Sequence, residues 1–261
     1  MTGHFNTEAI VLSSMDYGES DKIVTLYTLE FGKLKGIAKG AKRSRKRFVN
    51  NLEPFSYIRL LFFQKQGRDL VMLEQADIIR RFDSILMEIY RIAFGSYCLE
   101  LLNEMTPEGQ KNQKAFDLLL RSLSILDKGV NIRNIVVSFE MKLLSILGYY
   151  PHLDGCVVCK KPAIRTGSVE TKIFFSSVRS GILCLDCRAI EGSLISVSPG
   201  TIKFLMLAAK TDVEKADRMA MPYWAAEECK EIMDDFLRHQ IGKELKSKRF
   251  LKKIQIMDYK R

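Results

Sequence analysis

The sequence predicts an α+β protein of several parts: a small N-terminal barrel of five strands, then an all-α region with an inserted module that carries four cysteines. Three observations predict this. Five short runs rich in β-branched and aromatic residues fill the first 80 residues, helical periodicity begins after Arg80, and two Cys-x-x-Cys pairs interrupt it. The predicted parts are a barrel domain (1–80), a helical domain (81–151 and 191–242), a cysteine module (152–190) and a basic C-terminal tail (243–261).

The five predicted strands are separated by turn residues at short intervals. Regular spacing of short strands favours a closed barrel over a parallel sheet. A five-stranded barrel with a basic loop and surface aromatic residues is typical of the OB-fold, which binds single nucleic-acid strands. Tyr57, Phe62 and Phe63 are candidates for stacking on bases, although the alternation of a barrel strand favours core positions for them. The predicted strands cover residues 8–14, 22–28, 34–38, 55–64 and 70–75.

The apolar residues after Arg80 predict a series of helices. The first covers residues 85–102 and ends before Thr106, and the second ends near Gly129. Asn131 is a candidate cap for a third helix, and Ser198 followed by proline is a favourable start for another beyond the cysteine module. The apolar stripes of these helices are most simply core, so they indicate no function by themselves.

The four cysteines form the most specific motif of the chain. Cys156 and Cys159 form one Cys-x-x-Cys pair, and after 24 residues Cys184 and Cys187 form the second. Two such turns can surround one tetrahedral Zn²⁺, and four thiolates leave no open position for a catalytic water. We therefore expect a structural zinc ion, with an empty cluster or redox chemistry as the alternatives. A disulfide pair would require an oxidising compartment, and the N-terminal residues show no secretory signal.

Three further residues are of types that can bind metals or react. Cys98 and Cys229 stand in apolar helical contexts and are predicted to be small buried residues. His152 precedes Cys156 by four residues, but the four cysteines already complete a tetrahedral site. His152 is therefore predicted to lie at the surface or beside a ligand.

Positive charge is concentrated in two segments of a chain whose formal net charge is +10. Such a balance indicates a polyanionic partner, and nucleic acid is favoured over an anionic membrane surface. Residues 31–52 contain no acidic residue, and interleaved glycines favour a mobile loop that contacts phosphates over a solvated face. For the second segment, residues 243–261, phosphate contact and a solvated tail are equally compatible with the sequence. The predicted DNA-binding residues are Lys35, Lys39, Lys42, Arg43, Arg45, Lys46 and Arg47.

Several segments resemble the family of the bacterial recombination mediator RecO. They include residues 17–28 (YGESDKIVTLYT), Lys39-Gly40-Ala41-Lys42-Arg43, Leu52-Glu53-Pro54-Phe55, Leu147-Gly148-Tyr149-Tyr150-Pro151 before the first cysteine pair, and residues 242–251 (GKELKSKRFL). These segments follow the family's order and span essentially the whole chain. No single motif is decisive, but their combination is specific.

The resemblance to the RecO family implies a DNA repair protein of the bacterial cytoplasm, associated with the nucleoid. Such a protein binds single- and double-stranded DNA and anneals complementary strands. With its partner RecR it helps load the RecA recombinase onto strands coated by single-stranded-DNA-binding protein (SSB), whose acidic C-terminal tail it contacts.

An enzymatic function is not favoured by the sequence. No zinc-protease, nucleophile-elbow, dinucleotide-binding or phosphate-loop motif is present. No purely apolar stretch approaches the roughly 20 residues that a membrane-spanning helix needs. A zinc-bearing adaptor that binds acidic partner tails without contacting DNA is the alternative to a DNA-binding mediator, and a hydrolase or nuclease is a distant third.

Overall fold

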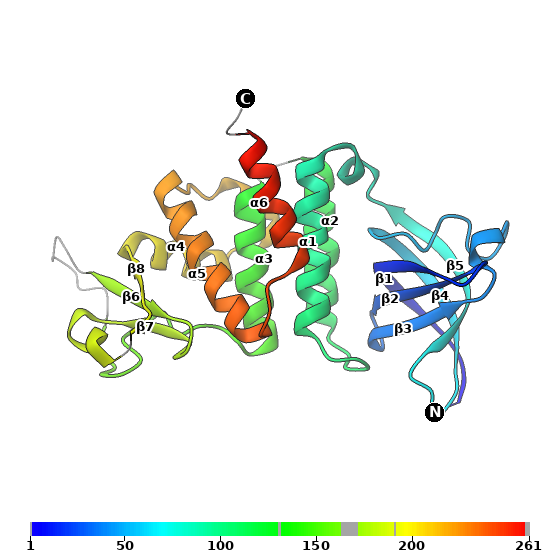
Figure 1. The fold of residues 1–261 in the computed structure, drawn as a ribbon, viewed down its shortest axis with the longest axis horizontal. Coiled ribbons are helices and arrows are strands. Elements are labelled where there is room, and N and C mark those ends of the chain that lie inside the picture. The colour runs from blue at the N-terminus through cyan, green and yellow to red at the C-terminus, as the bar shows by residue number, and fades with distance from the viewer. Residues whose placement is uncertain (1, 130–131, 163–171, 191, 259–261) are drawn as a thin grey trace. The chain divides into compact units, whose positions relative to one another are not determined.

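The computed structural model describes residues 2–129, 132–162, 172–190 and 192–258 (Figure 1). The chain divides into two compact units, one formed by residues 1–129 with 250–261 and the other by residues 130–249. The first unit contains the barrel and two helices, and the second contains three helices and a small sheet. The domain boundaries that the sequence predicts at residues 80, 151 and 242 stay predictions.

The N-terminal barrel is closed, as the sequence predicts, with the strand order β1-β2-β3-β5-β4. Closure depends on β1, which pairs with β2 through one part of its length and with β4 through the other. Parallel pairing of β3 with β5 completes the circle. The strands are β1 (Gly3–Tyr17), β2 (Asp21–Thr28), β3 (Gly32–Ala38), β4 (Ser56–Gln64) and β5 (Val71–Arg81).

Two of the strands are longer than the sequence predicts. The first residues of β1 pair with the end of β4, where Gly3 lies opposite Gln64. The last residues of β5 pair with the start of β4, where Arg81 lies opposite Ser56. Both additions therefore pair with the same strand, β4, which lies between β1 and β5.

Alternate strand residues fill the barrel core. Phe62 is fully buried there and contacts the rings of Phe5 and Phe31. Tyr57 and Phe63 instead point out of the barrel: Tyr57 contacts the ring of Phe116 in α2, and Phe63 is only partly buried. The favoured position in the barrel core is therefore confirmed for Phe62 and is wrong for Tyr57 and Phe63, because the side chains of β4 alternate.

Two helices complete the first unit, α1 (Ile89–Met105) and α2 (Gln113–Lys128). The helix predicted from residue 85 begins as a separate 3-10 turn, Asp83–Met87, because the extended backbone of Glu88 separates it from α1. The loop between α1 and α2 packs on β3: Gly109 N–H donates to the Lys33 carbonyl at 2.9 Å, and Lys33 Nζ donates to the Asn103 carbonyl at 2.6 Å.

The second unit contains α3 (Ile132–Leu147), α4 (Pro199–Lys210) and α5 (Tyr223–Ile241). Ser198 caps α4 as predicted, since its hydroxyl accepts from Thr201 N–H at 3.2 Å. Buried polar groups join α3 to its neighbours: Ser138 Oγ donates to the Ala208 carbonyl and Asn134 Nδ2 to the Met219 carbonyl. Asn131, the predicted cap of α3, lies outside the described residues.

A three-stranded sheet with the order β7-β6-β8 belongs to the same unit. Phe175 of β6 packs edge-on against Phe236 of α5, so the sheet is held on the helices. Strand β8 has only three residues, too few to show a period in the sequence. The strands are β6 (Ile173–Ser176), β7 (Gly181–Leu183) and β8 (Ile195–Val197).

Most of the C-terminal basic segment is helical, in α6 (Lys246–Asp258). Lys248 is only 14% exposed and forms ion pairs with Asp234 and Glu140. Its charge is therefore compensated within the protein. Lys260 and Arg261 lie outside the described residues.

Gly32 tests the packing of the α1–α2 loop on the barrel. It has a φ of +66°, and a side chain there would run into the carbonyl of Gln110. We expect Gly32→Ala to lower the free energy of unfolding by about 2–5 kcal/mol, combining a left-handed backbone with overpacking. Urea unfolding measures this.

Gly67→Ala is the matched control, since Gly67 has a φ of +77° and nothing within 4 Å of the added carbon. It should cost only about 1 kcal/mol. Equal losses in the two variants would show that contact with Gln110 does not constrain the loop.

Candidate metal centre and nucleic-acid interface

The four predicted ligand cysteines come from two turns of the second unit. Cys156 and Cys159 form a turn closed by a hydrogen bond from Lys160 N–H to the Cys156 carbonyl at 2.9 Å. Cys184 directly follows β7, and a hydrogen bond from Cys187 N–H to the Cys184 carbonyl closes the second turn at 3.1 Å. Because Val157 N–H donates to the Ile182 carbonyl, the first turn is fixed beside β7.

The geometry of these four thiols fits a tetrahedral metal ion. All four Sγ atoms lie within 4.8 Å of one another, and Cys159 Sγ is 3.7 Å from Cys184 Sγ. Zinc–sulfur bonds of about 2.3 Å place the sulfurs of a tetrahedron about 3.8 Å apart. The cluster predicted from the spacing is thus assembled, and its residues are placed to hold a metal ion. His152 takes no part in it.

The thiols differ in how readily they ionise. Burial opposes ionisation of Cys156, but hydrogen bonds from the backbone N–H groups of Cys159, Cys184 and Val158 outweigh it and lower the pKa of Cys156 to about 6. Desolvation and hydrogen bonds with the neighbouring thiols raise the pKa of Cys187 to about 12. The Cys156 thiol therefore loses its proton easily. Full ionisation of the cluster, including Cys187, needs a bound cation to offset the accumulated negative charge.

Gly181 allows the first cysteine turn to approach β7 closely. A side chain at this position would come within 2.7 Å of the His152 carbonyl and within 2.6 Å of Val157 Cγ1. Along the same contact, the His152 carbonyl accepts from Ile182 N–H at 3.1 Å and His152 N–H donates to the Ser180 carbonyl at 2.8 Å. The two halves of the four-cysteine cluster are therefore positioned by backbone packing.

The predicted mobile basic loop is held at both ends in the structure. Gly40 N–H donates to Asp21 Oδ1 at 2.8 Å at the start of the loop, and Arg81 donates to the Asn50 carbonyl at 3.1 Å near its end. A 3-10 turn, Ala41–Arg43, follows Gly40. Ala41, Phe48 and Leu52 are buried in the barrel core. The prediction of a mobile loop is therefore wrong. The loop is fixed, because its own apolar residues pack into the barrel core.

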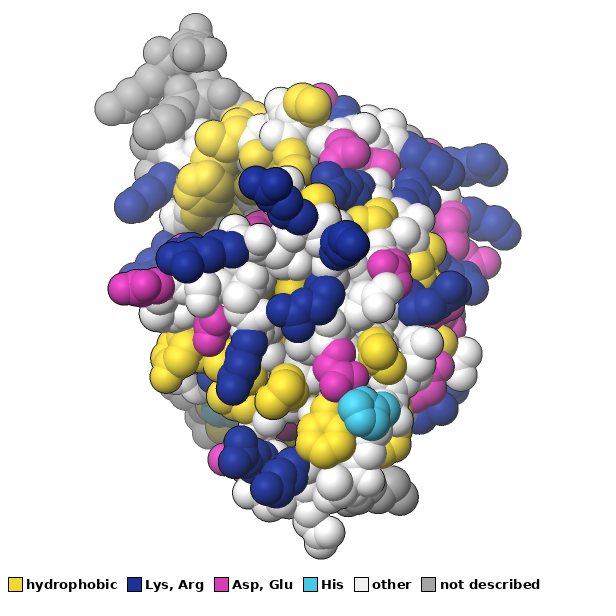
Figure 2. Space-filling model, turned by 90° about the vertical axis from the view of Figure 1, so that its right-hand side faces the viewer, with side chains coloured by type: hydrophobic (Ala, Val, Ile, Leu, Met, Phe, Trp, Pro, Cys, Tyr) yellow, Lys and Arg dark blue, Asp and Glu magenta, His cyan; other side chains and the backbone are white. Residues whose placement is uncertain are grey.

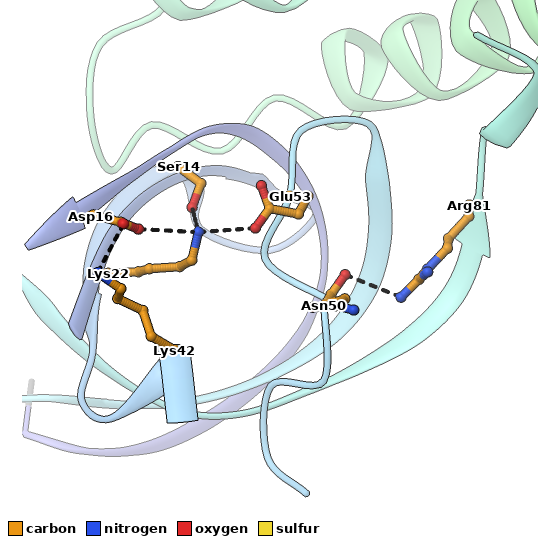
Figure 3. A network of polar contacts seen from close by, with 7 residues as sticks. All are labelled: Ser14, Asp16, Lys22, Lys42, Asn50, Glu53 and Arg81. Atoms are coloured by element: carbon orange, nitrogen blue, oxygen red, sulfur yellow. Dashed lines mark hydrogen bonds and ion pairs between the residues drawn. The ribbon is translucent and has the colours of Figure 1, made fainter. Parts of the chain in front are cut away.

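Ion pairs divide the predicted DNA-binding residues into two groups, and Figure 3 shows the pair of Lys42 with Asp16. Lys42 Nζ lies 3.0 Å from Asp16 Oδ2, and this contact, with those of Lys22, keeps the pKa of Asp16 below its ordinary value. Arg43 lies 4.0 Å from Glu19. Lys42 and Arg43 are therefore paired with carboxylates at the end of β1 and in the β1–β2 turn. The exposed residues that form no ion pair with the described residues are Lys35, Lys39, Arg45 and Lys46.

Arg47 has a structural contact of its own. Its guanidinium donates to the Lys39 carbonyl at 3.0 Å and lies over the ring of Phe48, 5.1 Å from the ring centre. It is still exposed to solvent. Arg47 therefore stabilises the loop and retains a surface for an anion.

Two cations of the β4–β5 turn were missed in the sequence. Lys65 and Arg68 flank Gly67 and are exposed. In an OB-fold this turn borders the ligand-binding face. The two cations beside its glycine could therefore have been recognised in the sequence as candidate binding residues. Seen from the barrel end, Lys and Arg side chains outnumber acidic ones, with hydrophobic side chains between them (Figure 2).

The barrel, its basic loop and the four-thiol centre define a class: proteins with an OB-type barrel, a helical region and a metal-binding module. Within that class the chain belongs to the RecO family. Residues 1–82 match the family model described as "Recombination protein O N terminal", and residues 87–249 match "Recombination protein O C terminal".

Relatives of similar length support this assignment. A DNA repair protein RecO of Syntrophus aciditrophicus is 37% identical over 253 residues, 96% of this chain and 96% of the relative. Those of Caldanaerobacter subterraneus subsp. tengcongensis and Bacillus pumilus are 34% and 33% identical over 95% and 96% of this chain, covering 97% and 94% of the relatives. Among the described residues, no helix has the length and apolar character needed to cross a membrane.

Loss of two ligands should release the metal and destabilise the second unit. In Cys156→Ser/Cys159→Ser we expect less than a tenth of the zinc found in the parent protein and a melting temperature lower by roughly 5–10 °C, since metal binding contributes folding free energy. Elemental analysis and thermal unfolding measure both. Cys98→Ser, a buried change outside the centre, should keep the metal. Normal stability of the metal-free double variant would show that the metal is not structural.

Thiol labelling should separate the six cysteines into two groups. Cys98 and Cys229 are buried, and burial raises the pKa of Cys229 to about 12, so at pH 8 its thiol stays protonated and unreactive. We expect alkylation of the four clustered thiols after chelation and of the other two only in denaturant. Mass spectrometry counts the labels; rapid labelling of Cys229 in the folded protein would contradict the burial.

Proposed function

We propose that the chain acts in DNA repair and recombination by binding DNA through the basic loop of its barrel. The observation that carries the proposal is a set of exposed cations, Lys39, Arg45 and Lys46, on a loop whose ends are fixed. Side-chain cations that are positioned by the loop but form no ion pair are available to phosphates. Contacts with phosphates do not depend on the base sequence. Membership of the RecO family supports the same role.

The finer proposal follows the resemblance in the sequence. The protein binds single- and double-stranded DNA and anneals complementary strands, because a basic surface screens the repulsion between their phosphates. With RecR it helps load RecA on SSB-coated strands and contacts the acidic SSB tail. This work requires neither a nucleophile nor ATP, so we propose a non-enzymatic mediator that acts at the nucleoid in the cytoplasm.

The metal in this proposal is a structural Zn²⁺ held by Cys156, Cys159, Cys184 and Cys187. A full set of thiolate ligands favours zinc and offers no position for a substrate. The ion would hold together two turns that backbone packing already brings close. Its role is therefore in the stability of the second unit.

An adaptor function is the second candidate. The same exposed cations would receive an acidic peptide as readily as DNA, since both present regular negative charge. Salt-dependent binding of DNA favours the mediator. Binding of an acidic peptide without measurable binding of DNA at low salt would favour the adaptor.

The loop is tested by removing its exposed charges. Lys39→Ala/Arg45→Ala/Lys46→Ala should weaken binding to single and double strands and reduce the slope of log affinity against log salt by about 2–3, since each lost phosphate contact removes about 0.7–0.9. Fluorescence anisotropy across a salt series measures the slope. The same variant should anneal complementary oligonucleotides more slowly.

A control variant changes the charge equally at another place. Lys111, Lys114 and Lys128 are exposed near the ends of α2, away from the barrel loop in sequence, and their triple alanine variant should keep the parent slope. If both triple variants lose the same slope, net charge rather than the loop determines binding. An unchanged slope in the loop variant would remove the loop from the interface.

A further inference from the structure

The four clustered cysteines differ in their access to solvent. Cys159 is exposed, Cys184 and Cys187 are partly buried, and Cys156 is fully buried. Oxidation of a cysteine follows the access of its sulfur to solvent as well as its thiolate character. A small oxidant in solution therefore reaches Cys159 first.

A sulfur of the other cysteine turn lies close to Cys159. Cys159 Sγ is 3.7 Å from Cys184 Sγ. A disulfide bond of about 2.0 Å requires the two sulfurs to approach each other by about 1.7 Å. Both residues reach solvent, so rotation of their side chains can supply this approach.

Cys156 is held more firmly than the other members of the cluster. Its sulfur accepts hydrogen bonds from the backbone N–H groups of Cys159, Cys184 and Val158. Moving this buried sulfur into a new bond would break these contacts. The disulfide within the first Cys-x-x-Cys pair, between Cys156 and Cys159, is therefore disfavoured.

Backbone contacts keep the two turns together without the help of a metal. Val157 N–H donates to the Ile182 carbonyl at 2.8 Å, and Ile182 N–H donates to the His152 carbonyl at 3.1 Å. These hydrogen bonds join backbone atoms only, so they persist when a thiolate is oxidised. The sulfurs of the two turns therefore stay near each other during loss of the metal.

We infer that Cys159 and Cys184 form an oxidation-sensitive pair, which a peroxide converts to a disulfide between the two cysteine turns while the cluster releases its metal. This inference goes beyond the proposed DNA binding, and it depends on the proposed Zn²⁺ only for the ion that is released. A disulfide between these residues leaves two of the four thiolates, too few for a structural zinc site.

The step balances with hydrogen peroxide as the oxidant. The Cys159 thiolate attacks one peroxide oxygen, the O–O bond breaks, and the products are a sulfenic acid and hydroxide. The Cys184 thiolate attacks the sulfenic sulfur, the S–O bond breaks, and a second hydroxide leaves. Two electrons pass from the sulfurs to the peroxide, and two protons from solvent convert the hydroxides to water.

The first test maps the bond in the full-length, zinc-loaded protein after treatment with hydrogen peroxide. Trypsin releases the first cysteine pair in one peptide, residues 143–160, and the second pair in another, residues 180–188. The inferred disulfide joins the two peptides, and fragmentation in the mass spectrometer should assign it to Cys159 and Cys184. A disulfide confined to either peptide, another pairing across them, or sulfinic acids without a disulfide would overturn the inference.

Zinc release is followed in parallel with a colorimetric chelator. We expect about one Zn²⁺ for each disulfide formed, and recovery of binding after a thiol reductant and fresh Zn²⁺ are added. Cys98→Ser is the control, since Cys98 is buried outside the cluster, and it should release zinc like the parent protein. A disulfide formed with the zinc retained would overturn the coupling.

The new bond should also take over the role of the metal as a link between the turns. It closes a loop that contains the 24 residues between Cys159 and Cys184, and closing such a loop restricts the unfolded chain. We expect the oxidised, metal-free protein to melt roughly 5 °C above the reduced, metal-free protein. Equal melting temperatures would show that the disulfide does not replace the metal.

The outcomes separate this inference from the proposed function. A protein isolated without zinc would overturn the proposed Zn²⁺, and peptide mapping would still decide the pairing of Cys159 with Cys184. DNA binding at low salt tests the proposed function independently of the cysteines.

Discussion

The double pairing of β1 is the constraint on which the first unit depends. Because β1 hydrogen-bonds to β2 along one part and to β4 along the other, the sheet closes on itself. Closure gives every strand residue a definite inside or outside position. The buried core, the contact with α2 through Tyr57 and the outward apolar side chains all follow from that assignment.

Charge compensation decides which cations of the barrel are available to a ligand. Lys22 illustrates the compensated kind: it is 20% exposed at its side chain and contacts Glu53 at 2.9 Å and Asp16 at 3.5 Å. Such residues hold turns together, as Lys42 does (Figure 3). Their neighbours Lys39 and Lys46 have no such partner among the described residues, so the same short segment contains both anchors and contact groups.

The sequence predicts those features that depend on local pattern. The spacing of Cys156, Cys159, Cys184 and Cys187 was sufficient to predict their cluster, whereas the strand pattern did not determine which of Phe62 and Phe63 is buried. The sequence does not predict contacts between distant segments. Examples are the extension of β1 and β5 along β4, and the insertion of Phe48 into the core, which replaces a mobile loop by a fixed one.

The anchoring of Phe48 and Leu52 in the barrel core also determines how a ligand can reach the surface. A loop whose own residues form the core does not swing over the barrel as a flap, so in the DNA binding that we propose the bound strand stays open to solvent. Binding of this kind would require no free end, and an internal stretch of a very long polymer would be as accessible as its terminus. Because little of the binding surface must become ordered, association is governed by diffusion and charge rather than by a closing step.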